Sequence, residues 1–127
     1  MMAGSELRGL RVLVVEDSYL VAASLRRMIE DMGGEVVGPA ATVADALLLV
    51  HPDRLDAGIL DVNLGSETSE PIAERLHELK LPFVFVTGYA SPTLVGSKFR
   101  AMKRVFKPVS EPALAAAIRQ SIQTGQS

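Results

Sequence analysis

The sequence predicts an α/β domain built on a central parallel β-sheet, and two observations lead to this prediction. Five short runs rich in β-branched residues alternate with longer segments whose apolar residues recur at helical spacing. The short runs are apolar along almost their whole length, as is typical of parallel strands that helices cover on both faces. We therefore expect strands at residues 11–15, 35–37, 57–60, 83–86 and 105–106, each followed by a helix.

Apolar spacing and capping residues indicate the first two helices. The apolar stripe of the first helix consists of Val21, Leu25, Met28, Ile29 and Met32. This helix should end at Gly33 and Gly34, because glycine tolerates the left-handed conformation that ends helices. Thr42 followed by Asp45 three residues later resembles a capping box, which predicts a short second helix that runs to about Val50.

The other three helices are indicated by a proline in the first turn. Pro71 marks the third helix, Ser91 followed by Pro92 marks the fourth, and Ser110 followed by Pro112 marks the fifth. The buried faces should hold Ile72, Leu76 and Leu79 in the third helix and Leu114, Ile118 and Ile122 in the last.

This order of elements predicts a flavodoxin-like (βα)5 domain, a doubly wound three-layer sandwich with its five parallel strands in the order 2-1-3-4-5. We find no repeat and no linker, so we expect one domain over residues 1–127 with its core at about 10–123. Ligands of such folds bind beyond the carboxyl ends of the strands, where the strand order reverses. The functional residues should therefore follow the strands directly.

Composition excludes several classes of protein. The formal net charge is −2, which favours no general attraction to nucleic acid or to an anionic membrane. The chain has no cysteine, so disulfides, thiolate metal sites and a cysteine nucleophile are excluded. No apolar stretch approaches the roughly 20 residues that span a bilayer, and we expect a cytoplasmic protein. His51 and His77 lie in polar surroundings and should be surface residues.

Polar residues follow four of the five predicted strands. In chain order they are Glu16, Asp17, Asp61, Thr87 and Lys107. Carboxylates brought this close together repel by a few kcal/mol per pair at an effective dielectric of about 20, so their convergence favours a bound cation. Oxygen ligands without histidine or cysteine are typical of Mg²⁺.

With Mg²⁺ in this pocket, a carboxylate could attack a phosphoryl donor. We expect Asp61 to be the nucleophile, because it closes the most central strand. The ammonium of Lys107 would stabilise the transferring oxygens, and Thr87 would donate a hydrogen bond to one of them. Gly88 would leave room for the phosphoryl group.

An acidic pair, a strand-end Asp, a Thr and a Lys-Pro at successive strand ends resemble the response-regulator receiver domain over nearly the whole chain. Residues 83–89 read FVFVTGY, which resembles the Phe-x-Phe-x-Thr-Gly-Tyr motif of the receiver subgroup called FATGUY. The resemblance implies a single-domain, CheY-like signalling protein of a two-component phosphorelay. It implies phosphorylation of Asp61 by a sensor histidine kinase, with no metabolic catalysis and no direct DNA binding.

The resemblance also implies roles for individual residues. The implied Mg²⁺ site consists of the carboxylates of Asp17 and Asp61 and the backbone carbonyl of Asn63. Glu16 would interact with these ligands without coordinating the metal itself. A cis peptide between Lys107 and Pro108 is implied as well.

One position departs from the family pattern. Most receivers have an aromatic residue three positions before the lysine, which moves together with the threonine, whereas here that residue is Arg104. Tyr89 or Phe106 could report phosphorylation instead, or the conformational readout of phosphorylation differs.

The basic segment from Lys98 to Arg104 could dock an acidic partner on the face formed by the fourth helix and fifth strand, although a solvated helix end explains it as well. We expect a monomer or a weak dimer.

Three alternatives remain open from the sequence. The domain could be a phosphate sink that drains a kinase shared with another regulator. A haloacid-dehalogenase-like phosphatase uses similar residues, but it places its nucleophile after the first strand, where this chain has Glu16 and Asp17. A flavodoxin-like FMN carrier needs a phosphate-cradling first loop rich in Ser, Thr and Gly, and this loop lacks it.

Overall fold

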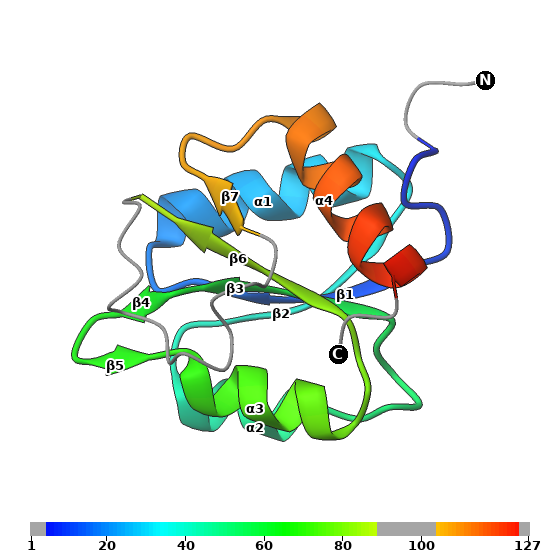
Figure 1. Ribbon diagram of the computed structural model, residues 1–127. Coiled ribbons are helices and arrows are strands. Elements are labelled where there is room, and N and C mark those ends of the chain that lie inside the picture. The colour runs from blue at the N-terminus through cyan, green and yellow to red at the C-terminus, as the bar shows by residue number, and fades with distance from the viewer. Residues whose placement is uncertain (1–4, 89–103, 125–127) are drawn as a thin grey trace.

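A computed structural model of the chain describes residues 5–88 and 104–124 (Figure 1). The strands of the main sheet are β1 (Arg11–Val15), β2 (Glu35–Ala40), β3 (Ala57–Asp61), β6 (Phe83–Thr87) and β7 (Arg104–Phe106). A small hairpin consists of β4 (Asn63–Leu64) and β5 (Glu67–Thr68). The helices are α1 (Tyr19–Asp31), α2 (Val43–Leu49), α3 (Glu70–Glu78) and α4 (Glu111–Thr124).

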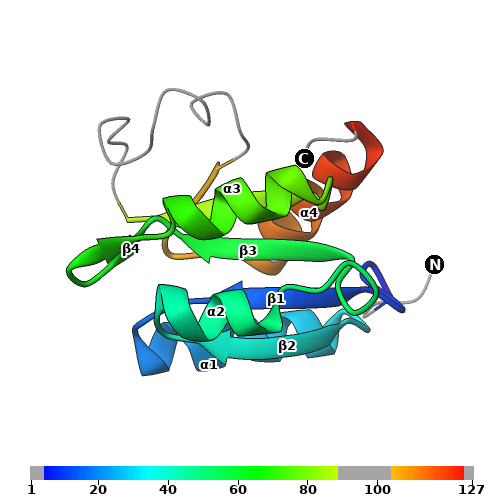
Figure 2. The same cartoon turned by 90° about the horizontal axis from the view of Figure 1, so that it is seen from below.

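The main sheet is parallel throughout, and its strands lie in the order β2-β1-β3-β6-β7. Counted along the chain, this is the predicted order 2-1-3-4-5. Helices α1 and α4 cover one face of the sheet, and α2 and α3 cover the other (Figures 1 and 2). The flavodoxin-like three-layer prediction is therefore confirmed for the described residues.

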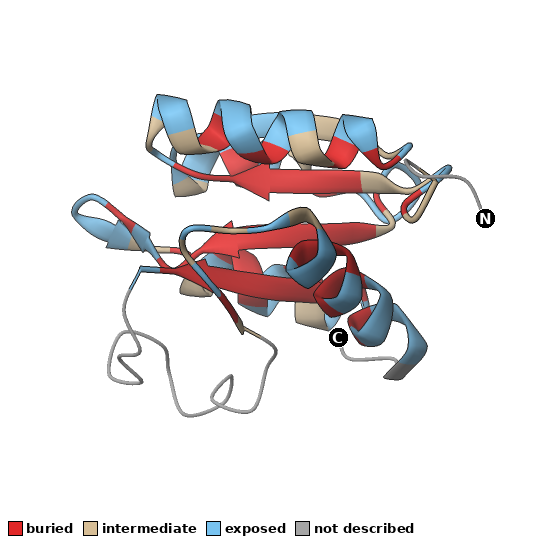
Figure 3. Cartoon of the chain, turned by 90° about the horizontal axis from the view of Figure 1, so that it is seen from above, coloured by how far each residue is buried: buried red, intermediate tan, exposed pale blue. Residues whose placement is uncertain are grey.

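The sheet divides the interior into two apolar cores, one beneath each pair of helices. Leu25, Ile29 and Ile118 pack in the core under α1 and α4, while Ile72 and Leu76 pack in the core under α2 and α3. Strands β1, β3 and β6 are buried along almost their whole length, and Figure 3 shows buried strands between helices that are exposed on their outer faces. Burial of this kind stabilises a domain by roughly 25 cal/mol per Å² of apolar surface, which is why all central strands are apolar.

Most of the predicted helix starts are confirmed. The Oγ1 of Thr42 accepts a hydrogen bond from the Asp45 N–H at 3.1 Å, and the Oγ of Ser110 accepts one from the Ala113 N–H at 3.3 Å. Pro71 lies in the first turn of α3, as expected. The helix predicted to start at residues 91–92 lies outside the described residues.

One predicted buried residue is wrong. Ile122 is 38% exposed, whereas Ser121 is buried in its place. At 100° per residue, Ser121 lies within about 20° of Leu114 around the helix axis, but Ile122 lies about 80° away. Residues spaced four apart, such as 114, 118 and 122, drift around the helix axis, so that Ile122 in the last turn no longer lies on the buried face.

Candidate functional site

Parallel pairing brings the predicted site residues to one edge of the sheet. Val15 pairs with Leu60, and Asp61 pairs with Val86, so the carboxyl ends of β1, β3 and β6 lie level with one another. The Lys107 N–H donates to the Thr87 carbonyl at 2.9 Å and thereby places the residue after β7 in the same row. The structure thus joins residues that are up to 91 positions apart in the chain.

A pocket of about 300 Å³ opens at this edge. It is lined by Asp17, Asp61, Asn63, Gly65, Thr87, Gly88 and Lys107. All the predicted ligands and reactive residues line this pocket except Glu16, which lies buried beside it. Gly88 is exposed at the rim, and a Cβ there would meet no other atom within 4 Å.

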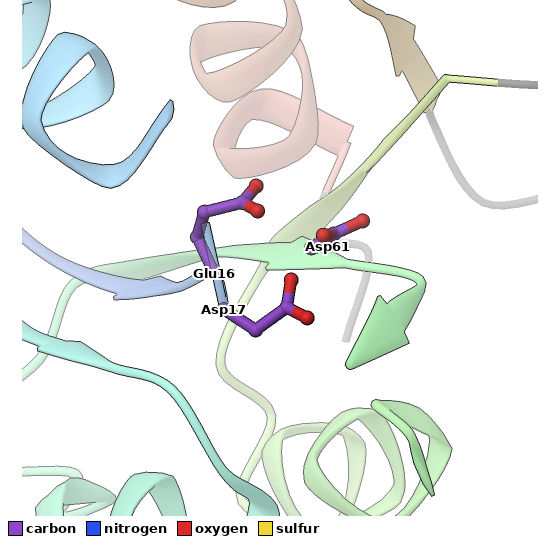
Figure 4. A group of neighbouring side chains, drawn as sticks. All are labelled: Glu16, Asp17 and Asp61. Atoms are coloured by element: carbon purple, nitrogen blue, oxygen red, sulfur yellow. The ribbon is translucent and has the colours of Figure 1, made fainter. Parts of the chain in front are cut away.

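Three carboxylates form the acidic part of the site (Figure 4). Glu16, Asp17 and Asp61 each offer an oxygen, and these atoms lie within 4.8 Å of one another. Glu16 and Asp61 are only 2% and 5% exposed, whereas Asp17 is exposed. The site therefore combines two desolvated carboxylates with one that faces solvent.

Lys107 offsets part of this charge. Its Nζ lies 3.2 Å from Glu16 Oε1 and 3.3 Å from Asp61 Oδ2. The peptide between Lys107 and Pro108 is cis, as the sequence led us to expect. Burial acts to lower the pKa of Lys107, but attraction by Asp61 and Glu16 outweighs burial and raises it, so the side chain is an ammonium ion.

Glu16 has a strongly shifted pKa. Burial, together with the nearby Asp61 carboxylate, raises it to about 7, against the opposing effects of the Ser18 N–H and Lys107. The Ser18 N–H and Lys107 Nζ donate to Glu16 Oε2 at 3.1 Å and 3.5 Å, while Oε1 accepts no hydrogen bond and interacts with Lys107 only as an ion pair. One lysine therefore leaves the excess negative charge of the pocket incompletely compensated.

The donor set fits Mg²⁺. Carboxylate oxygens converge on one open pocket, Asn63 lines the same pocket, and neither histidine of the chain does. Crowding of the carboxylates also favours a bound cation, because a divalent ion would offset the negative charge of Asp61, which together with the larger effect of burial raises the pKa of Glu16.

This electrostatic arrangement predicts a pH-dependent effect of Mg²⁺. Because the folded-state pKa of Glu16 is raised from 4.5 to about 7, the metal-free protein should lose stability as pH rises through that window. Mg²⁺ favours ionised carboxylates, so it should raise the melting temperature more above pH 7 than near pH 5. At ten times its dissociation constant the stabilisation would be about 1.4 kcal/mol. Thermal unfolding with Mg²⁺ and with EDTA measures this, and an equal shift at both pH values would contradict the prediction.

The sequence did not reveal the β4–β5 hairpin, which forms one wall of the pocket. Its turn contains Gly65, whose φ of 73° lies in the left-handed region that favours glycine. A Cβ at this position would lie 3.9 Å from Asp17 Oδ2, so the turn closely approaches the acidic group. The Asn63 N–H donates to Asp61 Oδ1 at 3.4 Å and links the hairpin to the central carboxylate. The glycine after Leu64 was the one available signal for this turn.

Other residues that the sequence singled out lie away from the pocket. Phe106 is 51% exposed on β7, and Arg104 begins the same strand. His51 is exposed and His77 is half-buried. Neither histidine lines the pocket, and Tyr89 and the basic residues 98, 100 and 103 lie outside the described residues.

A flavodoxin-like domain with an acidic pocket and a lysine at the carboxyl edge of its sheet is the arrangement that the resemblance to receiver domains led us to expect. Residues 12–119 match the response regulator receiver domain, and the chain belongs to this family. It is thus a receiver domain of two-component response regulators.

Named relatives agree with this assignment. The phyllosphere-induced regulator PhyR of Methylorubrum extorquens is 28% identical over 98% of this chain and 49% of that protein. The sensory transduction protein LytT of Bacillus cereus is 31% identical over 93% of this chain and 49% of that protein. The chain thus spans about half the length of these curated relatives. The solution structure of SdrG from Sphingomonas melonis Fr1 superposes with a TM-score of 0.78, at 40% identity over 94% of this chain and 98% of SdrG.

Proposed function

We propose that Asp61 accepts a phosphoryl group from the histidine of a sensor kinase and that this event switches a protein-binding surface. The observation that carries the proposal is the convergence of Asp17, Asp61, Asn63, Thr87 and Lys107 on one pocket. Asp61 is central in this pocket and nearly buried, so its carboxylate is poorly hydrated and is held at a fixed position at the end of β3.

In this proposal an Asp61 oxygen forms a bond to phosphorus while the bond from phosphorus to the donor nitrogen breaks, and the leaving nitrogen takes up a proton. Lys107, already 3.3 Å from Asp61, holds a positive charge beside the transferring oxygens. Thr87 would donate its hydroxyl proton to one of these oxygens. Mg²⁺ held by Asp17, Asp61 and the Asn63 carbonyl would supply a Lewis acid that offsets their negative charge.

Intact mass after incubation with acetyl phosphate tests the reaction without knowledge of the kinase. We expect the protein to gain one phosphoryl mass with Mg²⁺ and none with EDTA. If neither sample gains mass, NMR with Mg²⁺ and beryllofluoride shows whether the pocket binds a phosphoryl mimic at all. Unchanged Thr87 and Gly65 amide signals in that experiment would reject the proposed function.

The proposal extends to the surface that meets the kinase. An apolar groove of about 420 Å³ runs between α1 and the segment after β7, and Lys107 lines both this groove and the Asp61 pocket. Leu20 in the groove is 79% exposed, beside Val21 and Pro108. Because Lys107 joins this groove to the pocket that holds Asp61, we propose that the kinase packs in the groove while its donor histidine reaches Asp61.

Leu20→Asp is therefore expected to slow phosphotransfer from the cognate kinase by about tenfold or more, because it places a charge in an apolar contact. Phosphorylation by acetyl phosphate, which needs no docking, should stay at the wild-type rate. Leu48→Asp is the matched control, since Leu48 is 75% exposed on α2, away from the groove. Transfer to Leu20→Asp at the wild-type rate would show that the kinase packs elsewhere.

Several further points are part of the same proposal. We place the output on the face that includes β7, where Phe106 is half-exposed, with a protein rather than DNA as the partner. We propose a cytoplasmic receiver domain with its core at residues 10–123. Within the part of the chain that the structure describes, no helix has the length and apolarity needed to cross a membrane.

A further inference from the structure

The β4–β5 hairpin carries one ligand of the proposed Mg²⁺ site but belongs to no larger sheet. Asn63 begins the hairpin and Gly65 turns it, and both line the Asp61 pocket. The hairpin strands pair over only two residues each, Asn63 with Thr68 and Leu64 with Glu67. Two-stranded hairpins this short are not stable alone, so other contacts must hold this one in place.

Two contacts hold the base of the hairpin. The Ser69 N–H donates to the Val62 carbonyl at 3.0 Å and closes the loop. Leu64 is 4% exposed and packs in the core under α2 and α3. These contacts fix the hairpin where it leaves the sheet, but neither of them is made by a residue of the outer strand β5 (Glu67–Thr68).

A third contact reaches from the outer strand to a helix. Glu67 Oε2 accepts a hydrogen bond from the Val43 N–H at 3.3 Å, over 24 residues of sequence. Val43 is the first residue of α2, where the backbone N–H has no partner within the helix. Thr42 already caps the Asp45 N–H, so Glu67 satisfies a second free donor of the same turn. Its negative charge also suits the positive end of the helix dipole.

We propose that Glu67 is a positioning residue for the Mg²⁺ site, which clamps the hairpin to α2 and so holds the Asn63 carbonyl over the Asp61 pocket. This inference rests on the proposed function, because it concerns the same metal site. Glu67 itself does not line the pocket. It acts through the orientation of the hairpin and not by ligation.

The test is Mg²⁺ titration followed by amide NMR signals of Gly65 and Gly88. Glu67→Ala should raise the Mg²⁺ concentration at half-saturation by about two- to tenfold, the range expected for one hydrogen bond. Glu67→Gln, which keeps a carbonyl acceptor, should restore most of the affinity. Glu74→Ala removes the same charge from an exposed position on α3 and should bind Mg²⁺ as the wild type does.

Val43→Pro removes the donor of the clamp instead of its acceptor. Proline is favoured at the first position of a helix, and the residue before it, Thr42, already has the extended conformation that proline requires. Val43→Pro should weaken Mg²⁺ binding as Glu67→Ala does. The protein that carries both substitutions should bind Mg²⁺ about as tightly as each single variant, because both substitutions remove the same hydrogen bond. The proposal would be overturned if Glu67→Gln bound Mg²⁺ as weakly as Glu67→Ala does. It would also be overturned if the losses of Mg²⁺ affinity in Glu67→Ala and Val43→Pro were fully additive in the double variant.

Hydrogen exchange without metal separates this inference from the proposed function. In metal-free protein, Glu67→Ala should speed exchange of the Val43 amide by about two- to tenfold, because the proposed clamp exists before metal binds. If Mg²⁺ leaves the amide signals of the wild-type protein unchanged, the proposed metal site is wrong, whatever the hydrogen-exchange result. An unchanged Val43 exchange rate in Glu67→Ala would reject the clamp even if Mg²⁺ binds normally.

Discussion

Asp61→Asn should gain no phosphoryl mass from acetyl phosphate under conditions that fully phosphorylate the wild type. The amide has nearly the same shape as the carboxylate and can still accept the Asn63 N–H at its oxygen, so the local fold should persist. The amide is a far weaker nucleophile, and no other carboxylate occupies the same central position at the end of β3. Intact mass spectrometry measures the result directly.

Loss of Asp61 also removes a proposed metal ligand, so a second variant must separate the two effects. Asp17→Asn should be phosphorylated slowly at low Mg²⁺ and recover when Mg²⁺ is raised, because Asp17 only holds the metal. Asp61→Asn should stay unmodified at any Mg²⁺ concentration. Asp53→Asn, on the exposed segment before β3, is the matched control and should behave as the wild type. Phosphoryl uptake by Asp61→Asn would assign the acceptor to another residue.

Lys107→Met should slow phosphorylation by acetyl phosphate by about a hundredfold or more, the cost typical of removing one preorganised charge from a reacting site. Methionine keeps the apolar stem of the side chain but removes the ammonium that lies within 3.3 Å of both Glu16 and Asp61. Without this cation, Glu16 should bind a proton even more readily, because the ion pair that now lowers its pKa is lost.

Lys80→Met is the control for this variant, since Lys80 is an exposed lysine between α3 and β6, at the amino end of β6, whereas the pocket lies at the carboxyl end of that strand. It should leave the rate unchanged. Thermal unfolding of both variants shows whether each is folded at the assay temperature. A folded Lys107→Met protein that is phosphorylated within a few-fold of the wild-type rate would remove Lys107 from the reaction.

The contrast between Asp61 and Glu67 shows how far sequence reasoning reaches. Asp61 was predictable because it ends an apolar run, and the rules of parallel sheets place all such ends at one edge. Thr87 and Lys107 followed from the same rule. Glu67 was not predictable, because its partner is a backbone N–H of Val43 that sequence patterns do not reveal.

The limits of periodicity also show in particular elements. The hairpin at residues 63–68 has strands of two residues, which are too short to show alternation. Strand β2 runs to Ala40, beyond the predicted end at residue 37, through a cis Gly38–Pro39 peptide. A proline argues against a central strand, but β2 lies at the edge of the sheet, where proline is tolerated.

The layered α/β architecture, the strand order and the set of polar residues at the strand ends could all be predicted from the amino-acid sequence. These features follow from local periodicity and from the few ways in which strands and helices of this length can pack. The distances within the site, the raised pKa of Glu16 and the contact between the hairpin and α2 could not be predicted in this way. Those depend on burial and on the approach of segments distant in the chain, and burial and approach are properties of the packed molecule alone.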